Sequence, residues 1–194
     1  MAKPVQHHLI LGGQRSGKSR QAERLAQAWL AATPAHQGVM IATAQPWDSE
    51  MRARIDQHQQ DRAQRLPSMR TVEEPVALAQ AIGAHSAPTT LVLVDCLTLW
   101  LSNLSMPMEP ATALDDQALQ QAGEQLCLAI ASAPGPVVLV SNEIGLGVIP
   151  MGREVRAYVD ALGRLNQQLA ATCDRVTLMA AGLPLALKGD ETCA

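Results

Sequence analysis

Short apolar runs alternate along the chain with longer segments in which apolar residues recur every three or four positions. The spacing in the segments 19–32 and 118–132 predicts amphipathic helices. Strands that are apolar without interruption are buried on both faces, as in a parallel sheet covered by helices. The pattern therefore predicts an α/β fold with a mostly parallel sheet flanked by helices. The predicted strands are HLIL at 8–11, GVMIAT at 38–43, TLVLVD at 90–95, PVVLVS at 136–141 and RVTLMA at 175–180.

The alternation runs the length of the chain, without an internal repeat or a low-complexity tract. A chain of 194 residues can bury about 70% of its unfolded surface around one core. The segment SNLSMPMEPATALDD at 102–116 follows neither period and carries Pro, Met and acidic residues, so we interpret it as a surface excursion. We predict a single domain over residues 1–194.

Composition limits the class of ligand. The net charge is -3, and the chain has three Trp, one Tyr and no Phe. Proteins that bind nucleic acid usually present a basic face and aromatic side chains on which bases stack. We therefore expect no nucleic-acid partner and favour a small, charged ligand.

The cysteines and the hydropathy indicate the compartment. Cys96, Cys127, Cys173 and Cys193 are widely spaced and form no CxxC pair, which argues against a zinc site or a disulfide framework. No run of 18 or more apolar residues predicts a membrane span, and the first apolar run is shorter than a signal peptide needs. We expect a cytoplasmic protein with reduced thiols.

The segment GGQRSGKS at 12–19 matches the pattern G-x-x-x-x-G-K-[ST] of a P-loop and lies between a predicted strand and a predicted helix. Its glycines let the backbone curl, so that N–H groups and the helix N-terminus face phosphate oxygens. Lys18 would neutralise the β- and γ-phosphates, and the Ser19 hydroxyl would reach Mg²⁺. We predict a nucleotide site formed by Gly12, Gly13, Gln14, Arg15, Ser16, Gly17, Lys18 and Ser19.

Two further acidic residues follow predicted strands. Asp95 ends TLVLVD, at the edge where open α/β sheets bind ligands, and we favour it as a Mg²⁺ ligand over the alternative role of a helix N-cap. Glu143 follows PVVLVS within SNEIGLG, where it could polarise a nucleophile, contact the substrate or lie on the loop surface.

The polar stretch RIDQHQQDR at 54–62 holds one histidine, His58. In a helix, Arg54, His58 and Arg62 would lie along one stripe. The residues alone leave two interpretations open: a solvated helix face, or a histidine placed to react. The other histidines, His7, His8, His36 and His85, we interpret as surface or strand-edge residues.

Several motifs together resemble one family, the bifunctional adenosylcobinamide kinase and adenosylcobinamide-phosphate guanylyltransferase of the CobU/CobP type. They are GGQRSGKS, IATAQPWDSEMRARIDQH, TVEEP, DCLTLWLSN, VSNEIGLGVIP, GRLNQ and GLPLALK, and they extend over nearly the whole chain. The resemblance implies a RecA-like P-loop NTPase fold and a homo-oligomer, because members of the family are trimers.

The resemblance also assigns roles to residues. The family pattern RIxxH falls on His58, which would carry the guanylyl group covalently, while Lys18 would act on the phosphates. A neutral imidazole nitrogen can attack the α-phosphorus of GTP, which gives this role a chemical basis. The remaining residues implied to line the guanine nucleotide site are Ala42, Thr43, Ala44, Gln59, Gln60, Asp61, Arg62, Glu73 and Asp95.

The implied function is phosphorylation of adenosylcobinamide with ATP or GTP, followed by transfer of GMP from GTP to give adenosylcobinamide-GDP. The partner would be a corrinoid small molecule, and Mg²⁺ the cofactor. The alternative is a RecA-like ATPase that acts as an assembly factor, in which Glu143 activates water. Such an ATPase would have no need of His58.

Overall fold

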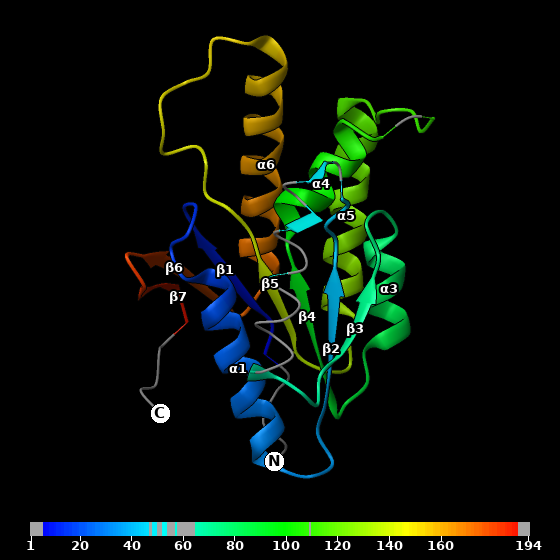
Figure 1. Cartoon of the computed structure of the whole chain (residues 1–194), viewed down its shortest axis with the longest axis vertical. Helices are drawn as coiled ribbons and strands as arrows, with labels where there is room; N and C mark the ends of the chain where they lie inside the picture. Colours follow the sequence, from blue (N-terminus) through cyan, green and yellow to red (C-terminus); the bar gives the residue numbers. More distant parts are fainter. Residues whose placement is uncertain are drawn as a thin grey trace.

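A seven-stranded sheet forms the centre of the molecule (Figure 1). The computed structural model describes residues 6–46, 48–49, 52–53, 57, 65–108 and 110–189. The strand order is β3-β2-β4-β5-β1-β6-β7, and only the β6–β7 pair, at one edge, is antiparallel. The strands are β1 His8–Gly12, β2 Gln37–Ala42, β3 Arg70–Glu73, β4 Thr90–Asp95, β5 Val137–Val140, β6 Arg175–Ala180 and β7 Leu183–Lys188.

The five strands predicted from apolar runs are the five inner strands of this sheet. Every residue of β1 and of β5 is buried, and so are five of the six residues of β4. The mostly parallel sheet flanked by helices is therefore confirmed. The two edge strands, β3 and β7, were absent from the prediction.

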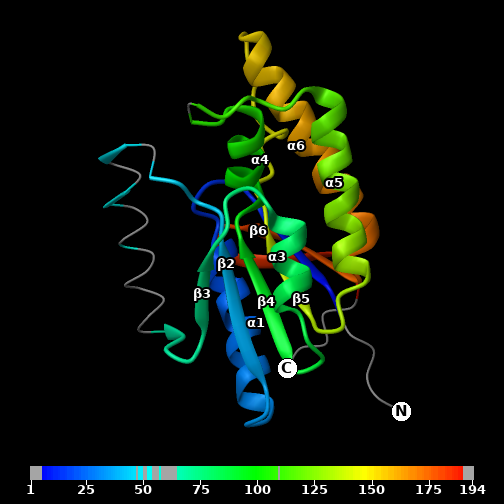
Figure 2. The same ribbon diagram turned by 90° about the vertical axis from the view of Figure 1, so that its right-hand side faces the viewer.

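Helices cover both faces of the sheet. They are α1 Lys18–Ala32, α3 Leu78–His85, α4 Leu97–Ser105, α5 Asp116–Ala131 and α6 Arg153–Thr172. Ala22 and Ala26 of α1 pack with Ile10, Met40 and Leu93 on one face. Helices α3, α4, α5 and α6 share a larger core on the opposite face, and Figure 2 shows α3, α5 and α6 together on that side.

The segment 102–116 is only partly a surface excursion. Its first four residues complete α4, where Leu104 belongs to the core and buried Asn103 bonds the carbonyls of Thr43 and Pro75. Asp115 then caps α5, since its Oδ1 accepts from Ala118 N at 2.8 Å. The prediction was therefore wrong for residues 102–105.

Two of the histidines interpreted as surface or strand-edge residues are buried, which corrects that interpretation. His7 and His8 are each 7% exposed. His8 lies in the inner strand β1, where Nε2 is 2.8 Å from Thr177 Oγ1, and burial lowers its pKa from 6.5 to about 4. Within the described residues, no helix is long and apolar enough to cross a membrane.

Candidate active site

The predicted phosphate loop lies at the carboxyl edge of the sheet, between the end of β1 and the start of α1. Gly12 ends the strand with φ of 152°, and a Cβ there would stand 2.5 Å from the Met179 carbonyl oxygen and 2.6 Å from Ser16 Oγ. Gly17 precedes the helix with φ of 99°. Both positions therefore require glycine, for the backbone conformation and, at Gly12, also for lack of space.

Lys18 folds back over this loop. Its Nζ donates to the carbonyl of Gly13 at 2.6 Å, and the residue is only 8% exposed. Burial lowers its pKa, while the nearby Cys96 and Asp95 oppose that shift. The electrostatic effect of Asp95 on Lys18 indicates that the two predicted residues lie near each other at this edge of the sheet.

The other loop residues divide by exposure. Gly13, Gln14 and Arg15 are exposed. Ser16 is buried, and no partner for its Oγ is found among the described residues. Ser19 lies half-buried in the first turn of α1, next to Lys18.

Two segments that are distant in sequence donate backbone hydrogen bonds to the phosphate loop. Glu143 N donates to the Gly12 carbonyl at 3.0 Å, and Gly182 N donates to the Ser16 carbonyl at 3.0 Å. Gly182 lies in the turn between β6 and β7 with φ of 81°. Sequence reasoning missed this support, because the turn can be recognised from its residues but its contact with the phosphate loop cannot.

Asp95 is the last residue of β4 and is paired with Ala42 of β2 and Val140 of β5. The N-cap of α4 is Cys96, so the alternative role of Asp95 as that cap is wrong. Burial, followed by the charge of Asp95, raises the pKa of the Cys96 thiol to about 11. The thiol therefore stays protonated at neutral pH.

A hydrogen-bonded cluster fixes the end of β2 beside Asp95. Thr43 Oγ1 donates to the Cys96 carbonyl at 2.7 Å and accepts from Cys96 N at 3.0 Å. Asn103 Nδ2 donates to the carbonyls of Thr43 and Pro75, at 2.8 and 3.0 Å. Asn103 is therefore a positioning residue of this edge, and sequence reasoning missed it because its partners lie in other loops.

The predicted nucleotide residues of β2 and β3 do converge. Ala42 is paired with Glu73, and Ala42, Thr43 and Ala44 continue from the carboxyl end of β2. Glu73 ends β3 and is exposed. These four residues therefore lie at the same edge of the sheet as the phosphate loop.

Five of the predicted residues, and the arginine that precedes them, lie outside the described part of the chain. They are Arg54, His58, Gln59, Gln60, Asp61 and Arg62. Among their described neighbours, Arg52, Ala53, Gln57 and Arg65 are helical. Arg65 is bound to α1: its guanidinium lies 3.2 Å from Glu23 Oε2, and its carbonyl accepts from Gln27 Nε2 at 2.9 Å.

Glu143 serves its own loop. Its Oε1 accepts from Gly145 N at 3.0 Å, and its backbone N binds the Gly12 carbonyl. The neighbouring Asn142 is held by Thr98 Oγ1 and Asn166 Nδ2, each at 3.0 Å. One carboxylate oxygen of Glu143 is thus engaged in shaping the loop, which gives this residue a structural role.

The donor set at this edge suits Mg²⁺. Ser19 supplies a hydroxyl oxygen and Asp95 a carboxylate. Among the residues described, no group of three or more His, Cys, Asp or Glu side chains could hold a metal ion. Mg²⁺ is usually bound through one or two carboxylates while phosphate oxygens and water complete its shell. The two residues therefore fit a magnesium ion that arrives with a nucleotide.

Comparison with known proteins agrees with this geometry. Residues 8–187 match the family described as cobinamide kinase / cobinamide phosphate guanyltransferase. The chain is 48% identical over 183 residues to the bifunctional adenosylcobalamin biosynthesis protein CobP of Pseudomonas aeruginosa, covering 94% of this chain and 97% of that protein. It is 38% identical over 187 residues to the bifunctional adenosylcobalamin biosynthesis protein CobU of Escherichia coli, which covers 93% of this chain and 98% of that protein.

Solved structures show the fold alone. A protein of Pyrococcus horikoshii superposes with a TM-score of 0.55 at 8% identity, covering 96% of this chain and 88% of its own. The flagellar accessory protein FlaH of Methanocaldococcus jannaschii superposes with a TM-score of 0.50 at 12% identity. The superposition covers 97% of this chain and 82% of FlaH. These structures share the α/β fold expected from the sequence, a mostly parallel sheet flanked by helices.

Proposed function

The chain belongs to the cobinamide kinase / cobinamide phosphate guanyltransferase family, and on that premise we propose that it forms adenosylcobinamide-GDP in two steps. It first phosphorylates adenosylcobinamide with ATP or GTP, and then transfers GMP from GTP to the new phosphate. The acceptor in both steps is a corrinoid small molecule, and the reaction takes place in the cytoplasm. The observation that carries the proposal is the phosphate loop with Lys18 folded over it.

In the kinase step the loop holds the triphosphate. The backbone N–H groups of residues 12–17, with the side chains of Lys18 and Ser19, bind the phosphate oxygens. The acceptor hydroxyl attacks the γ-phosphorus, the bond to the bridging oxygen breaks, and the nucleoside diphosphate leaves. Lys18 has only to turn from the Gly13 carbonyl to a phosphate oxygen to stabilise the charge on the leaving group.

Ser19 and Asp95 would hold Mg²⁺ between the loop and the end of β4. When bound, the ion neutralises the charge that develops on the phosphates. Cys96 and Thr43 fix the backbone around Asp95 through the hydrogen bonds described above, so the carboxylate is presented from a rigid edge.

In the guanylyl step we assign the nucleophile to His58. One imidazole nitrogen attacks the α-phosphorus of GTP, the bond to the β-phosphate oxygen breaks, and pyrophosphate leaves. A phosphate oxygen of adenosylcobinamide phosphate then attacks the same phosphorus, the P–N bond breaks, and the imidazole is restored. The assignment rests on the family pattern RIxxH at 54–58.

The anchoring of the chain on either side supports this assignment. Thr43 is fixed at the carboxyl edge of the sheet, and Arg65 is bound to α1, the helix that follows the phosphate loop. His58 therefore belongs to a segment that is tied at both ends to elements of the candidate site. Ala42, Thr43, Ala44, Glu73 and the range 59–62 are proposed to contact the guanine nucleotide.

We also propose a homo-oligomer, a trimer by resemblance to the family. A loop of exposed apolar residues connects β5 to α6 and extends away from the sheet (Figure 1). Leu146 is 81% exposed, Val148 96%, Ile149 78% and Met151 94%. Contiguous apolar surface of this kind is typical of a protein–protein contact, and a second copy of the chain is its expected partner.

Labelled GTP tests the covalent step and separates it from the kinase step. After incubation and denaturation, label from the α-phosphate should remain on the protein and be released by acid, whereas γ-label should not be retained. The His58→Asn variant should retain no α-label and should accumulate adenosylcobinamide phosphate. Label on another residue would overturn the role of His58. Steady hydrolysis of nucleotide without a corrinoid would instead favour the ATPase alternative.

A further inference from the structure

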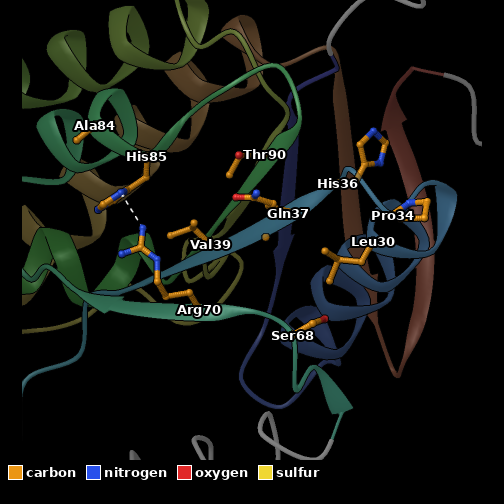
Figure 3. Close-up of a pocket in the computed structure, with 11 residues that line it drawn as sticks. Leu30, Pro34, His36, Gln37, Val39, Ser68, Arg70, Ala84, His85 and Thr90 are labelled. Carbon is orange, nitrogen blue, oxygen red and sulfur yellow. Dashed lines mark hydrogen bonds between the residues drawn. The ribbon is translucent and has the colours of Figure 1, made fainter.

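A second hollow, of about 530 Å³, lies at the opposite edge of the sheet, where β2, β3 and β4 begin (Figure 3). Its volume lies in the range of small-molecule sites, about 300–1,000 Å³. β2 separates it from the candidate active site by its whole length, roughly 17 Å at the usual rise of a strand. The family function described above makes no use of it.

Strand register brings polar side chains together in this hollow. Val39 is paired with Arg70 of β3, and Gln37 is paired with Thr90 of β4. Residues two apart in a strand share a face, so these four side chains project from the same face of the sheet. His85, at the end of α3, closes that side.

Arg70 and His85 form the polar end of the hollow. Arg70 Nη2 donates to His85 Nδ1 at 3.1 Å, the bond drawn in Figure 3. A guanidinium can only donate, so His85 Nδ1 is the acceptor, and the proton of the neutral ring is on Nε2. The contact orients the guanidinium while most of its N–H groups are left for another acceptor, and Arg70 is itself exposed.

The other end is flat and less polar. His36 and Pro34 lie there with Leu30 of α1, well apart from Arg70 in Figure 3. The His36 ring stacks on Trp29 at 3.6 Å with 1° between the planes, and Nδ1 donates to the Trp29 carbonyl at 2.8 Å. The His36 ring is therefore held in place by Trp29. Its edge or the face that does not contact Trp29 is the part that a ligand in the hollow could contact.

We propose that this hollow binds a small molecule with a phosphate or carboxylate group on a flat, uncharged body. The oxyanion would accept from the guanidinium of Arg70, whose planar set of donors matches either group. Gln37 and Thr90 would donate to polar atoms in the middle of the ligand, and the body would lie against Pro34 and His36. Nothing in the assignment depends on the reaction proposed above.

The binding is measured on the full chain with inorganic phosphate as the probe. The imidazole NMR signals of His36 and His85, assigned from single His→Gln variants, are followed during the titration. The His85 signal should shift and saturate, and it should do so equally in Lys18→Ala, which disables the phosphate loop. Arg70→Gln should weaken phosphate binding at this site about tenfold to a hundredfold, as expected when a hydrogen bond to a charged group is lost.

Two comparisons make the test specific. Arg24→Gln removes an exposed arginine that does not line the hollow, and it should leave the titration unchanged; Arg70→Lys should fall between wild type and Arg70→Gln, because it keeps the charge without the planar donors. Phenyl phosphate should bind more tightly than phosphate and should also shift His36. Equal phosphate affinity in wild type and Arg70→Gln, with both proteins folded by their amide spectra, would overturn the site. Equal affinity for the two probes would overturn the apolar half of the assignment.

Discussion

Replacing Lys18 by alanine gives the sharpest test of the phosphate loop. The side chain is 8% exposed, its amine lies on the Gly13 carbonyl, and Asp95 acts on it electrostatically. The folded loop thus holds a positive charge that has already lost most of its contact with water. A charge that is already oriented and partly desolvated attracts a phosphate more strongly than the charge of an exposed lysine would.

The magnitude follows from Coulomb's law. Two unit charges about 4 Å apart interact by about 4 kcal/mol at an effective dielectric constant of about 20. Because 1.36 kcal/mol is a factor of ten in rate, this is about a thousandfold. We expect Lys18→Ala to lower the kinase kcat/KM by about 10² to 10³. Stability should change by less than about 3 kcal/mol, since only one charged hydrogen bond is lost.

Lys188 provides the matched control. It is the other lysine that the structure describes, and its Nζ also donates to backbone carbonyls, those of Ala170 and Ala171 at 2.9 and 3.0 Å. Formation of adenosylcobinamide phosphate is measured by chromatography for wild type, Lys18→Ala and Lys188→Ala. Thermal unfolding with and without GTP should show ligand stabilisation in wild type and Lys188→Ala, and little in Lys18→Ala.

The reasoning fails if folded Lys18→Ala turns over at a near-normal rate. It fails equally if Lys188→Ala loses as much activity, because the effect would then belong to lysine contacts in general. A Lys18→Ala protein that has lost activity but is still stabilised by GTP to the full extent would show that the loop binds nucleotide without this charge.

The remaining predictions concern metal, pH and assembly. Asp95→Asn should raise the Mg²⁺ concentration needed for half-maximal activity without lowering the melting temperature appreciably; an unchanged metal titration would remove Asp95 from the metal site. The folded-state pKa of His8, about 4, lies below its unfolded value of 6.5, so the unfolded chain takes up the proton first and stability falls as pH drops through this interval. The loss from this residue should be about 2 kcal/mol between pH 7 and 5, at 1.36 kcal/mol per unit, and urea unfolding of His8→Gln should show a smaller dependence on pH; an undiminished dependence would place the effect elsewhere. Val148→Asp with Ile149→Asp should shift sedimentation from the oligomer to the monomer, and an unaltered oligomer would exclude that loop as the contact.

The inner strands and the phosphate loop could be predicted because local sequence determines them. Uninterrupted apolar runs such as TLVLVD are typical of strands buried on both faces of a sheet. Glycines at fixed distances before Lys18 are typical of a phosphate-binding loop. The edge strands carry a weaker signal, because β3 is mostly polar and a proline interrupts the apolar run of β7. β3 has one apolar residue, Val72, in four, and every residue of β7 is exposed, with a proline at its second position. Their strand character comes from pairing with β2 and β6, which only the fold provides.

The active-site residues divide along the same line. Lys18, Ser19 and Asp95 follow from motifs and from the ends of strands. Asn103 and Gly182 do not, because each acts through a backbone contact with a segment far away in the sequence. His58 stays a prediction, since it lies outside the described residues.

The position of β1 has a consequence for how the chain is made. β1 is paired only with β5 and β6, and the phosphate loop that follows it is supported by Glu143 and Gly182. All of these partners are translated long after the P-loop motif has left the ribosome. For most of its synthesis, the nascent chain therefore contains the P-loop motif but lacks the strands and backbone contacts that hold this loop in place. β1 must stay unpaired until β5 has been made, and its other edge stays open until β6 follows; long-range pairing of this kind is slow and exposes the chain to aggregation. A chain shortened before β6 should therefore be a substrate for chaperones rather than a weaker enzyme.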